Sequence, residues 1–410
     1  MPLHDCDHDY EHKEGTSMPL SESTVPPPIE PDPHQRTPQP PEPELDLQPK
    51  TKETIKPLSQ HPSTHLYTLS YLIFFAVFGT LARLGLQSLT FYTGAPIVTG
   101  VLWANASGSL LMGFFLEDKN LFREEWGENQ ETIDEHERLK AHKATKKTIP
   151  LYIGLTTGFC GCFTSFSSFI RDVFLALAND LPDPSRDPFS GPVSRNGGYS
   201  FMALIAILLI TVSLSLAALV AGAHLALACD RFTPVLPFVF TRRILDPIMV
   251  ILGWGCWLGA VFMAIWPPDR HNLETETWRG AAIFAIVFAP LGCLLRFYLS
   301  LFLNAKLPSF PLGTFAANIL GTGILGMCYD LQHISGIGTS VVSCQVLQGV
   351  MDGFCGSLTT ISTWVAELNG LGKRRYAYFY GTVSVGVGLG LLVVTMGSLL
   401  WTRGFDTPVC

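Results

Sequence analysis

The sequence predicts an all-α integral membrane protein. Of its 410 residues, 48% are hydrophobic and only 15% are charged, and the hydrophobic residues are gathered in long blocks. A helix needs roughly 20 apolar residues to cross the hydrocarbon core of a bilayer. Such blocks lie near residues 70–91, 97–116, 150–176, 201–228, 246–266, 280–303, 311–329, 340–368 and 377–401. Because the apolar residues are not at amphipathic spacing, we expect nine transmembrane helices and not a large soluble protein.

Two of these blocks contain a similar interruption. The segments are GFCGCFTSFSSF at residues 158–169 and GFCGSLTTISTW at residues 353–364. Free backbone groups are tolerated at membrane depth only where they are buried in protein or line a cavity. Paired interruptions of apolar segments in corresponding positions point to an ion-handling site. We therefore expect a broken helix in each half of the chain.

Two further motifs also occur once in each half. The motif GxxxR ends at Arg83 and Arg296, and NxxG begins at Asn105 and Asn318, so both pairs are 213 residues apart. The interruptions are 195 residues apart, since the first half contains a longer loop. The block at 245–266 has no counterpart, and one extra crossing inverts whatever follows it. The sequence thus predicts two inverted four-helix repeats, each with a broken third helix, joined by one linking helix.

The domain order follows from these repeats. Residues 1–66 are rich in Pro and acidic residues and are expected to form a disordered cytosolic tail. The remaining boundaries are a first repeat at 67–228 with a charged cytosolic loop at 117–149, a linker at 229–278 holding the helix 245–266, a second repeat at 279–403 and a short tail at 404–410. Most of the ten cysteines lie in apolar blocks, so they are expected to act as small hydrophobic residues without forming disulfides.

The positions of Lys and Arg predict the orientation. The tail, the loop at 117–149 and the segment 229–244 carry most of them. The positive-inside rule then places the amino terminus in the cytosol and the carboxyl terminus outside. The net charge of −7 comes from the tail and the same loop, so it does not indicate an acidic or basic partner, and we expect no nucleic-acid binding.

The polar residues at matched positions suggest an anion path. Arg83 and Arg296 are costly inside a membrane and are expected to face a vestibule, with snorkelling to a headgroup as the alternative. Asn105 and Asn318 offer N–H donors that, with Ser and Thr hydroxyls, could replace the hydration shell of a small anion. Interhelical hydrogen bonding is the alternative for these amides.

Two aromatic residues follow the first interruption. Phe166 and Phe169 are three residues apart, so both can project from one face of the resumed helix. The edge of an aromatic ring carries partial positive charge and can face an anion. Core packing is the ordinary explanation for such a pair.

Together these motifs resemble the Fluc (CrcB) family of fluoride channels, in the fused two-repeat form found in eukaryotic fluoride exporters. The resemblance covers residues 68–401 and is most specific in the block after the interruption. It implies a structural Na⁺, held at the centre by backbone carbonyls of Gly161, Thr164, Gly356 and Thr359. It also implies an anion path lined by Asn105, Asn318, Phe166, Phe169, Tyr380, Ser384, Ser165 and Thr360.

The two repeats depart from this family pattern in different ways. Ile361 and Trp364 stand where the first repeat has its two Phe residues, and Leu209 and Ser213 stand where the second repeat has Tyr380 and Ser384. This difference predicts one working pore and one vestigial pore. We expect the working path to use the two Phe residues with the Tyr and Ser of the second repeat.

The resemblance implies a passive, fluoride-selective channel of the plasma membrane that exports fluoride from the cytosol. A single chain would take the place of the family's homodimer, with fluoride and the lipid bilayer as its partners. A proton-coupled or exchanging small-anion transporter is the alternative. An enzyme is not expected, since no nucleophile and base, and no carboxylate pair, fall at matched depth.

Overall fold

The structure is a computed structural model that describes residues 62–90, 92, 95, 97, 99–126, 142, 144–182, 196–267, 277–334, 336 and 340–410. These residues belong to one unit, Lys56–Cys410. All regular secondary structure in these ranges is helical. The predicted tail lies outside the described residues except at its end, because the first helix already begins at Pro62.

The first half contains two long helices, a segmented third run and a fourth helix. In chain order these are α1 (Pro62–Thr90), α2 (Val101–Glu117), the short α3 (Arg123–Trp126), α5 (Pro150–Ile153), the π-helical η2 (Gly154–Cys160), α6 (Gly161–Phe163), α7 (Phe166–Ala178) and α8 (Gly197–Ala228). Most of the charged loop between α3 and α5 lies outside the described residues. The third run is broken between α6 and α7, as the sequence predicts.

The second half repeats this order after a linking helix. The linker consists of α9 (Phe238–Phe240), η4 (Thr241–Leu245) and α10 (Asp246–Ile265). The second half consists of α11 (Thr277–Leu303), η5 (Asn304–Lys306), α12 (Leu312–Gln332), α13 (Val341–Gly349), η6 (Val350–Cys355), α14 (Gly356–Leu358), α15 (Ser362–Gly370), α16 (Arg374–Val394) and α17 (Met396–Thr402). The second broken run again has a π-helical segment, which the short α14 separates from the break.

Seven helical runs in the described ranges are long and apolar enough to cross a membrane. They correspond to seven of the nine predicted blocks, and the protein is a helical membrane protein. The other two blocks form α2, which has 17 residues, and the broken run from α13 to α15.

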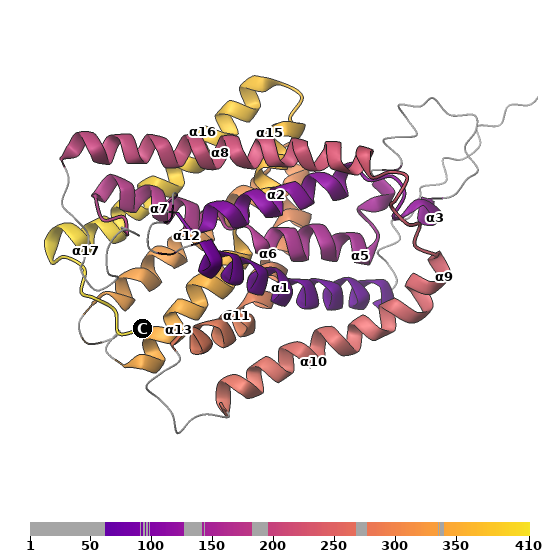
Figure 1. The fold of residues 1–410 in the computed structure, drawn as a ribbon, viewed down its shortest axis with the longest axis horizontal. Coiled ribbons are helices and arrows are strands. Elements are labelled where there is room, and N and C mark those ends of the chain that lie inside the picture. Colours follow the sequence, from indigo (N-terminus) through magenta and orange to yellow (C-terminus); the bar gives the residue numbers. More distant parts are fainter. Residues whose placement is uncertain are drawn as a thin grey trace, which may run out of the picture. The chain divides into compact units, whose positions relative to one another are not determined.

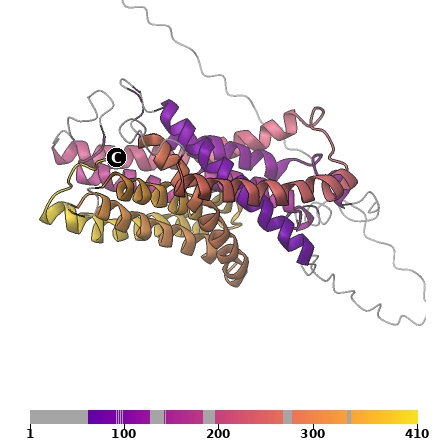
Figure 2. The same ribbon diagram turned by 90° about the horizontal axis from the view of Figure 1, so that it is seen from below.

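The two halves pack by exchanging their resumed half-helices. In the first half, α7 contacts α12 and α16 of the second half, while α15 of the second half contacts α2 and α8 of the first. The helices α1 and α11 also contact one another. In Figure 2 the orange-to-yellow helices of the second half lie against the purple-to-magenta helices of the first. Both breaks therefore come together at the interface between the halves, where α6 contacts α14.

The linking helix α10 packs on the outside of α1 and α11 (Figure 1). Gly253 permits this close approach, because a Cβ there would lie 2.5 Å from the backbone oxygen of Ser70. Trp254 Nε1 donates to Ser70 Oγ at 3.1 Å, and Tyr71 OH donates to the buried carboxylate of Asp246 at 3.0 Å. These hydrogen bonds fix the linking helix to the first helix of the bundle.

Candidate functional site

Each break begins where a threonine leaves helical geometry. Thr164 ends α6 with φ −103° and ψ 151°, and Thr359 ends α14 with φ −94° and ψ 155°. In the first half the chain resumes its helix at Phe166, where Ser165 caps the new helix by accepting from Ser168 N. The backbone is thus extended for about two residues in the middle of an apolar run, so its polar groups need other partners.

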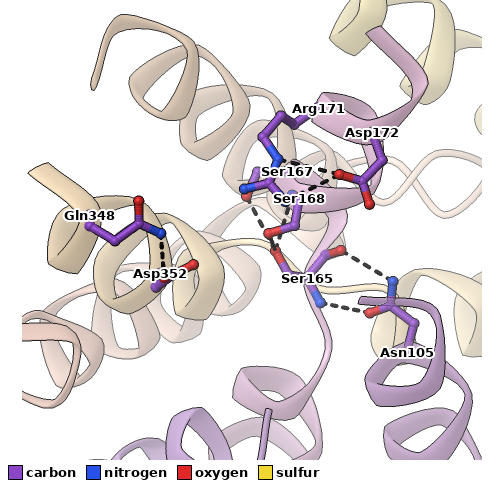
Figure 3. Close-up of polar contacts among 8 residues, drawn as sticks. All are labelled: Asn105, Ser165, Ser167, Ser168, Arg171, Asp172, Gln348 and Asp352. Atoms are coloured by element: carbon purple, nitrogen blue, oxygen red, sulfur yellow. Dashed lines mark hydrogen bonds and ion pairs between the residues drawn. The ribbon is translucent and has the colours of Figure 1, made fainter. Parts of the chain in front are cut away.

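Asparagine side chains supply those partners in both halves. Ser165 N donates to Asn105 Oδ1 at 2.8 Å, and Asn105 Nδ2 donates back to Ser165 O at 3.4 Å (Figure 3). In the second half Thr360 N donates to Asn318 Oδ1 at 2.9 Å, and Asn318 Nδ2 donates to Thr360 O at 3.3 Å. Both Asn side chains are fully buried. The interhelical role that the sequence left open is therefore present at both copies.

The same hydrogen bonds release two glycine carbonyls. In a continuous helix, Ser165 N would donate to Gly161 O and Thr360 N to Gly356 O. Both N–H groups donate to an asparagine instead. Two main-chain oxygens are thereby left without their helical donors next to the interface between the halves.

Hydroxyl groups join the two breaks across that interface. Thr164 Oγ1 lies 3.1 Å from Thr360 Oγ1 and 3.1 Å from Ser362 Oγ. The matching Thr359 Oγ1 lies 3.0 Å from Ser167 Oγ and accepts from Ser167 N at 3.1 Å. These five side chains are fully buried, so the centre of the molecule is a layer of hydroxyl and carbonyl oxygens.

Each of the two predicted vestibule arginines contacts the segmented run of the opposite half, and Arg296 also contacts that of its own half. Arg83 donates to the backbone oxygen of Asp352, and Arg296 donates to Ser357 O at 2.9 Å and Thr157 O at 2.8 Å. Arg83 is 1% exposed and Arg296 is 2% exposed. Neither side chain snorkels to the membrane surface, and Arg296 also lines a cavity.

Glycine makes room for both guanidinium groups. A Cβ at Gly161 would lie 2.2 Å from Arg296 Nη1, and one at Gly356 would lie 2.2 Å from Arg83 Nη1. The glycine of each Gly-x-x-Thr segment is therefore required by a long-range contact, since its backbone has ordinary helical geometry.

Two cavities lie on opposite sides of this layer. One, of about 420 Å³, is lined by the ends of α2 and α11 and by the resumed helix α15, including Lys147, Arg296 and Glu367. The other, of about 340 Å³, is lined by the end of α1, the start of α2 and the resumed helix α7, including Arg171, Asp172 and Asp352. Residues at corresponding positions of the two halves line both cavities.

Glu367 is a site residue that the sequence reasoning missed. Its carboxylate accepts from Tyr380 OH at 2.8 Å and from Thr314 Oγ1 at 2.6 Å. It thus connects the larger cavity to Tyr380, one of the predicted pore residues. The sequence contained a signal for this residue. Glu367 and Asp172 are both acidic and are 195 residues apart, which is also the offset between the two interruptions.

The predicted aromatic and polar pore residues lie where α7 packs against α16. The rings of Phe166 and Phe169 are 5.9 Å apart, and Phe166 lies edge-on to Trp364 at 5.5 Å. A side chain at Gly388 would lie 3.5 Å from Phe166, so α16 passes directly beside that ring. Ser384 and Tyr380 are buried on the same helix, about one and two turns earlier, respectively. The structure therefore brings the first repeat's Phe pair to the second repeat's Tyr and Ser.

The corresponding positions on α8 point elsewhere. Leu209 is 64% exposed and Ser213 is also exposed, so they do not face the interior. Thr211 and Ser215 are the buried polar residues of this helix segment. The expectation that Leu209 and Ser213 occupy the wall positions of the first repeat is wrong, because α8 is rotated so that neighbouring residues face inward.

A disulfide joins Cys344, in the first turn of α13, to Cys410. This corrects the expectation that the cysteines form no disulfides. The two cysteines are 66 residues apart in sequence. The carboxyl-terminal segment that ends at Cys410 also packs the ring of Phe405 against Tyr329. The other cysteines of the described ranges are free, and four of them are buried near the breaks at Cys160, Cys162, Cys293 and Cys355.

Comparison with known proteins assigns the chain to one family. Residues 70–223 and 283–398 match the family described as CrcB-like protein, Camphor Resistance (CrcB). The chain is similar to fluoride export protein 1 of Neurospora crassa, with 59% identity over 85% of this chain and 69% of that protein. Fluoride export protein 1 of Candida albicans is 37% identical over 81% of this chain and 79% of that protein.

A shorter relative matches one part of the chain. The fluoride-specific ion channel FluC of Pseudomonas paraeruginosa is 35% identical over 31% of this chain and 98% of that protein. No solved structure matches the chain.

Proposed function

The chain belongs to the CrcB family, and we propose on that basis that it is a fluoride channel that exports fluoride from the cytosol. Its relatives are named as fluoride export proteins and as a fluoride-specific ion channel. The observation that carries the proposal is the central layer, where two breaks present hydroxyl and amide groups between two cavities. Groups of this kind can replace the hydration shell of a small anion.

Export of this kind needs no source of energy other than the membrane potential. An inside-negative potential of 100 mV drives a monovalent anion outward by about 2.3 kcal/mol. Conduction through a passive pathway is then sufficient, and the protein acts as a channel and not as an enzyme.

One pathway carries the ion in this proposal. It leads from the larger cavity past Glu367 to Tyr380 and Ser384, and then to the edges of Phe166 and Phe169. The support for it is the packing of α7 against α16, in which Trp364 lies between the rings of Phe166 and Tyr380. The ring edges offer partial positive charge to an anion, and the Tyr380 proton, which is donated to Glu367 in this structure, would be given to the passing ion instead.

The equivalent pathway of the other half is proposed to be vestigial. Ile361 and Trp364 replace its Phe pair, and α2 packs directly against α8 there. A Cβ at Gly113 would lie 1.9 Å from Leu219 O, and one at Gly222 would lie 1.9 Å from Leu110 O. The two helix backbones are therefore in contact where a conducting path would need space.

A structural Na⁺ at the centre is part of the same proposal. The carbonyls of Gly161 and Gly356 lack their helical donors, and the extended Thr164 and Thr359 add two more oxygens. Oxygen ligands of this type suit a hard cation. The guanidinium groups lie on the Cβ side of the two glycines, whereas helix carbonyls point along the axis toward the break.

Sodium is then expected to stabilise the chain. Replacing Na⁺ by N-methyl-D-glucamine, which is too large for such a site, should lower the melting temperature of purified protein by several degrees. Choline, at the same ionic strength, separates loss of the ion from a general salt effect. An unchanged melting temperature across all three cations would refute the sodium site.

We further propose nine crossings, with the second four-helix repeat inverted and one chain doing what the family's homodimer does. The exchange of α7 and α15 between the halves supports this arrangement. The orientation has the amino terminus in the cytosol and the carboxyl terminus outside at the plasma membrane. The disulfide between Cys344 and Cys410 favours this orientation, because disulfides persist in oxidising surroundings.

Thiol labelling tests this orientation. On intact cells, a membrane-impermeant maleimide should label Cys410 only after treatment with an impermeant reductant, and a Cys410→Ser variant should lose much of that signal. The free Cys229 follows α8 at its predicted cytosolic end, so it should be labelled only after permeabilisation. Labelling of Cys229 on intact cells would reverse the proposed orientation.

Fluoride efflux from liposomes containing the purified chain tests the function itself. With valinomycin clamping the voltage, rapid efflux that follows the voltage and excludes chloride is expected. Flux that appears only under a pH gradient at fixed voltage would favour the proton-coupled or exchanging transporter. An absence of flux under both conditions would overturn the proposed function.

A further inference from the structure

The two cavities differ in the charged groups that line them. Among the described residues, the larger cavity is lined by Lys147, Arg296 and Glu367, which carry a formal charge of +1 in total. The smaller cavity is lined by Arg171, Asp172 and Asp352, which carry −1 in total. The buried Arg83 lies behind the smaller cavity and donates to the backbone of Asp352.

The difference arises at positions where the two halves have diverged. Applying the offset of 195 residues, Glu367 corresponds to Asp172, which preserves one carboxylate in each cavity. Lys147 corresponds to Val342, however, and Thr157 corresponds to Asp352. The first half thus adds a cation to one cavity, and the second half adds an anion to the other.

The added cation is held in place by its neighbour. Lys146 is 2% exposed, and its Nζ donates to Phe115 O at 2.7 Å and to Asp118 O at 2.5 Å, both at the end of α2. Burial raises the pKa of Asp118, whose Oδ2 accepts from Leu121 N at 3.0 Å. This anchor leaves the adjacent Lys147 exposed at the mouth of the larger cavity.

The added anion is held just as firmly. Gln348 Nε2 donates to Asp352 Oδ2 at 2.6 Å, and Arg171 pairs with Asp172 at 3.1 Å (Figure 3). The cation in this cavity is therefore already paired with a carboxylate of its own helix. Asp352 is thus the carboxylate in excess among the residues that line this cavity, and the buried Arg83 contacts its backbone from outside the lining.

We propose that this charge difference makes fluoride conduction asymmetric, with anions entering more readily from the cavity at Lys147 than from the cavity at Asp352. The inference rests on the proposed channel function and on the orientation that places Lys147 in the cytosol. A unit charge about 8 Å away in water changes the local concentration of a monovalent anion roughly twofold. Charges of opposite sign at the two mouths, each changing entry about twofold, therefore favour outward over inward fluoride movement about fourfold at low salt.

The reversal potential is unaffected, since fixed charges at the mouths change entry rates and not the electrochemical gradient. The effect must also fade with ionic strength, because the Debye length falls from about 30 Å at 0.01 M to about 3 Å at 1 M. Asymmetry that depends on salt is thus the signature that separates mouth charges from an intrinsically asymmetric pore.

Inside-out patches from cells expressing the full chain allow the test, because the sidedness is that of the cell. With 15 mM fluoride on both sides, the current carried by fluoride leaving the cytosol should exceed the reverse current about fourfold at equal and opposite voltages. In 1 M fluoride the ratio should approach one. Lys147→Gln should reduce the outward movement about twofold at 15 mM, and Asp352→Asn should increase the inward movement about twofold.

Lys306→Gln is the matched control, since Lys306 is exposed on the same side but does not line the cavity. It should leave the ratio unchanged. In a Lys147→Cys variant, a cationic methanethiosulfonate applied from the cytosolic side should restore the wild-type ratio, and an anionic one should reduce it further.

The outcomes distinguish this inference from the proposed function. An absence of fluoride current in wild-type patches would count against the channel itself. A fluoride current that is symmetric at 15 mM, or that is unaltered by Lys147→Gln, would overturn the charge asymmetry alone.

Discussion

Replacing Gly161 by alanine is expected to destabilise the folded chain by about 3 kcal/mol and to abolish fluoride efflux. The new methyl group would lie 2.2 Å from Arg296 Nη1 and 2.5 Å from its Nη2. This guanidinium is buried and holds Ser357 O and Thr157 O, so it can move only by breaking those hydrogen bonds. Hydrogen bonds to charged groups contribute about 1.5–3 kcal/mol each, and a displaced buried charge adds to the loss.

The thermal stability of purified protein, followed by size-exclusion chromatography after heating, measures this effect. Gly356→Ala should behave in the same way, because its methyl group would meet Arg83. Gly255→Ala is the control, since a Cβ there has nothing within 4 Å and alanine is the better helix former. If Gly161→Ala were as stable as Gly255→Ala, the guanidinium contact would not support the break.

Phe166→Ile is expected to reduce fluoride efflux at least a hundredfold while the protein remains folded. The substitution gives the working pathway the residue that the other half has at Ile361, and it removes the ring edge beside Trp364. The side chain is fully buried against α16, so the aliphatic replacement keeps most of the packing. Voltage-driven efflux from liposomes, normalised to the amount of folded protein, is the measurement.

Ile361→Val is the matched substitution in the other half. It removes one methylene group from a buried side chain of the proposed vestigial pathway and should leave efflux within twofold of wild type. Comparable losses in both variants would show that both pathways conduct. A loss only in Ile361→Val would assign conduction to the other half.

The sequence alone predicted the class of protein, the broken helices and the internal repeat. These features are local, or follow from a constant difference between the residue numbers of matching motifs. A block of apolar residues forms a membrane helix wherever it packs. Gly, Thr and Ser interrupt a helix through their own backbone preferences. The correspondence of Asn105 with Asn318 required only an offset. The predicted number of crossings and the inversion of the second repeat remain proposals.

The tertiary structure decided how the predicted groups are used. It turned both Asn amides toward the broken backbone, sent each Arg into the opposite half, and joined Glu367 to Tyr380. No local pattern encodes these contacts, because each joins segments from different helices.

Helix rotation and disulfide pairing were likewise decided by long-range packing. The α8 helix is apolar on every side, so its sequence favours no inward face, and contact with α2 places Thr211 and Ser215 inside in place of Leu209 and Ser213. The bond between Cys344 and Cys410 depends on where the carboxyl-terminal segment packs. Hydrophobicity along the chain determines which segments are helices, whereas the rotation of each helix depends on neighbours that are distant in sequence.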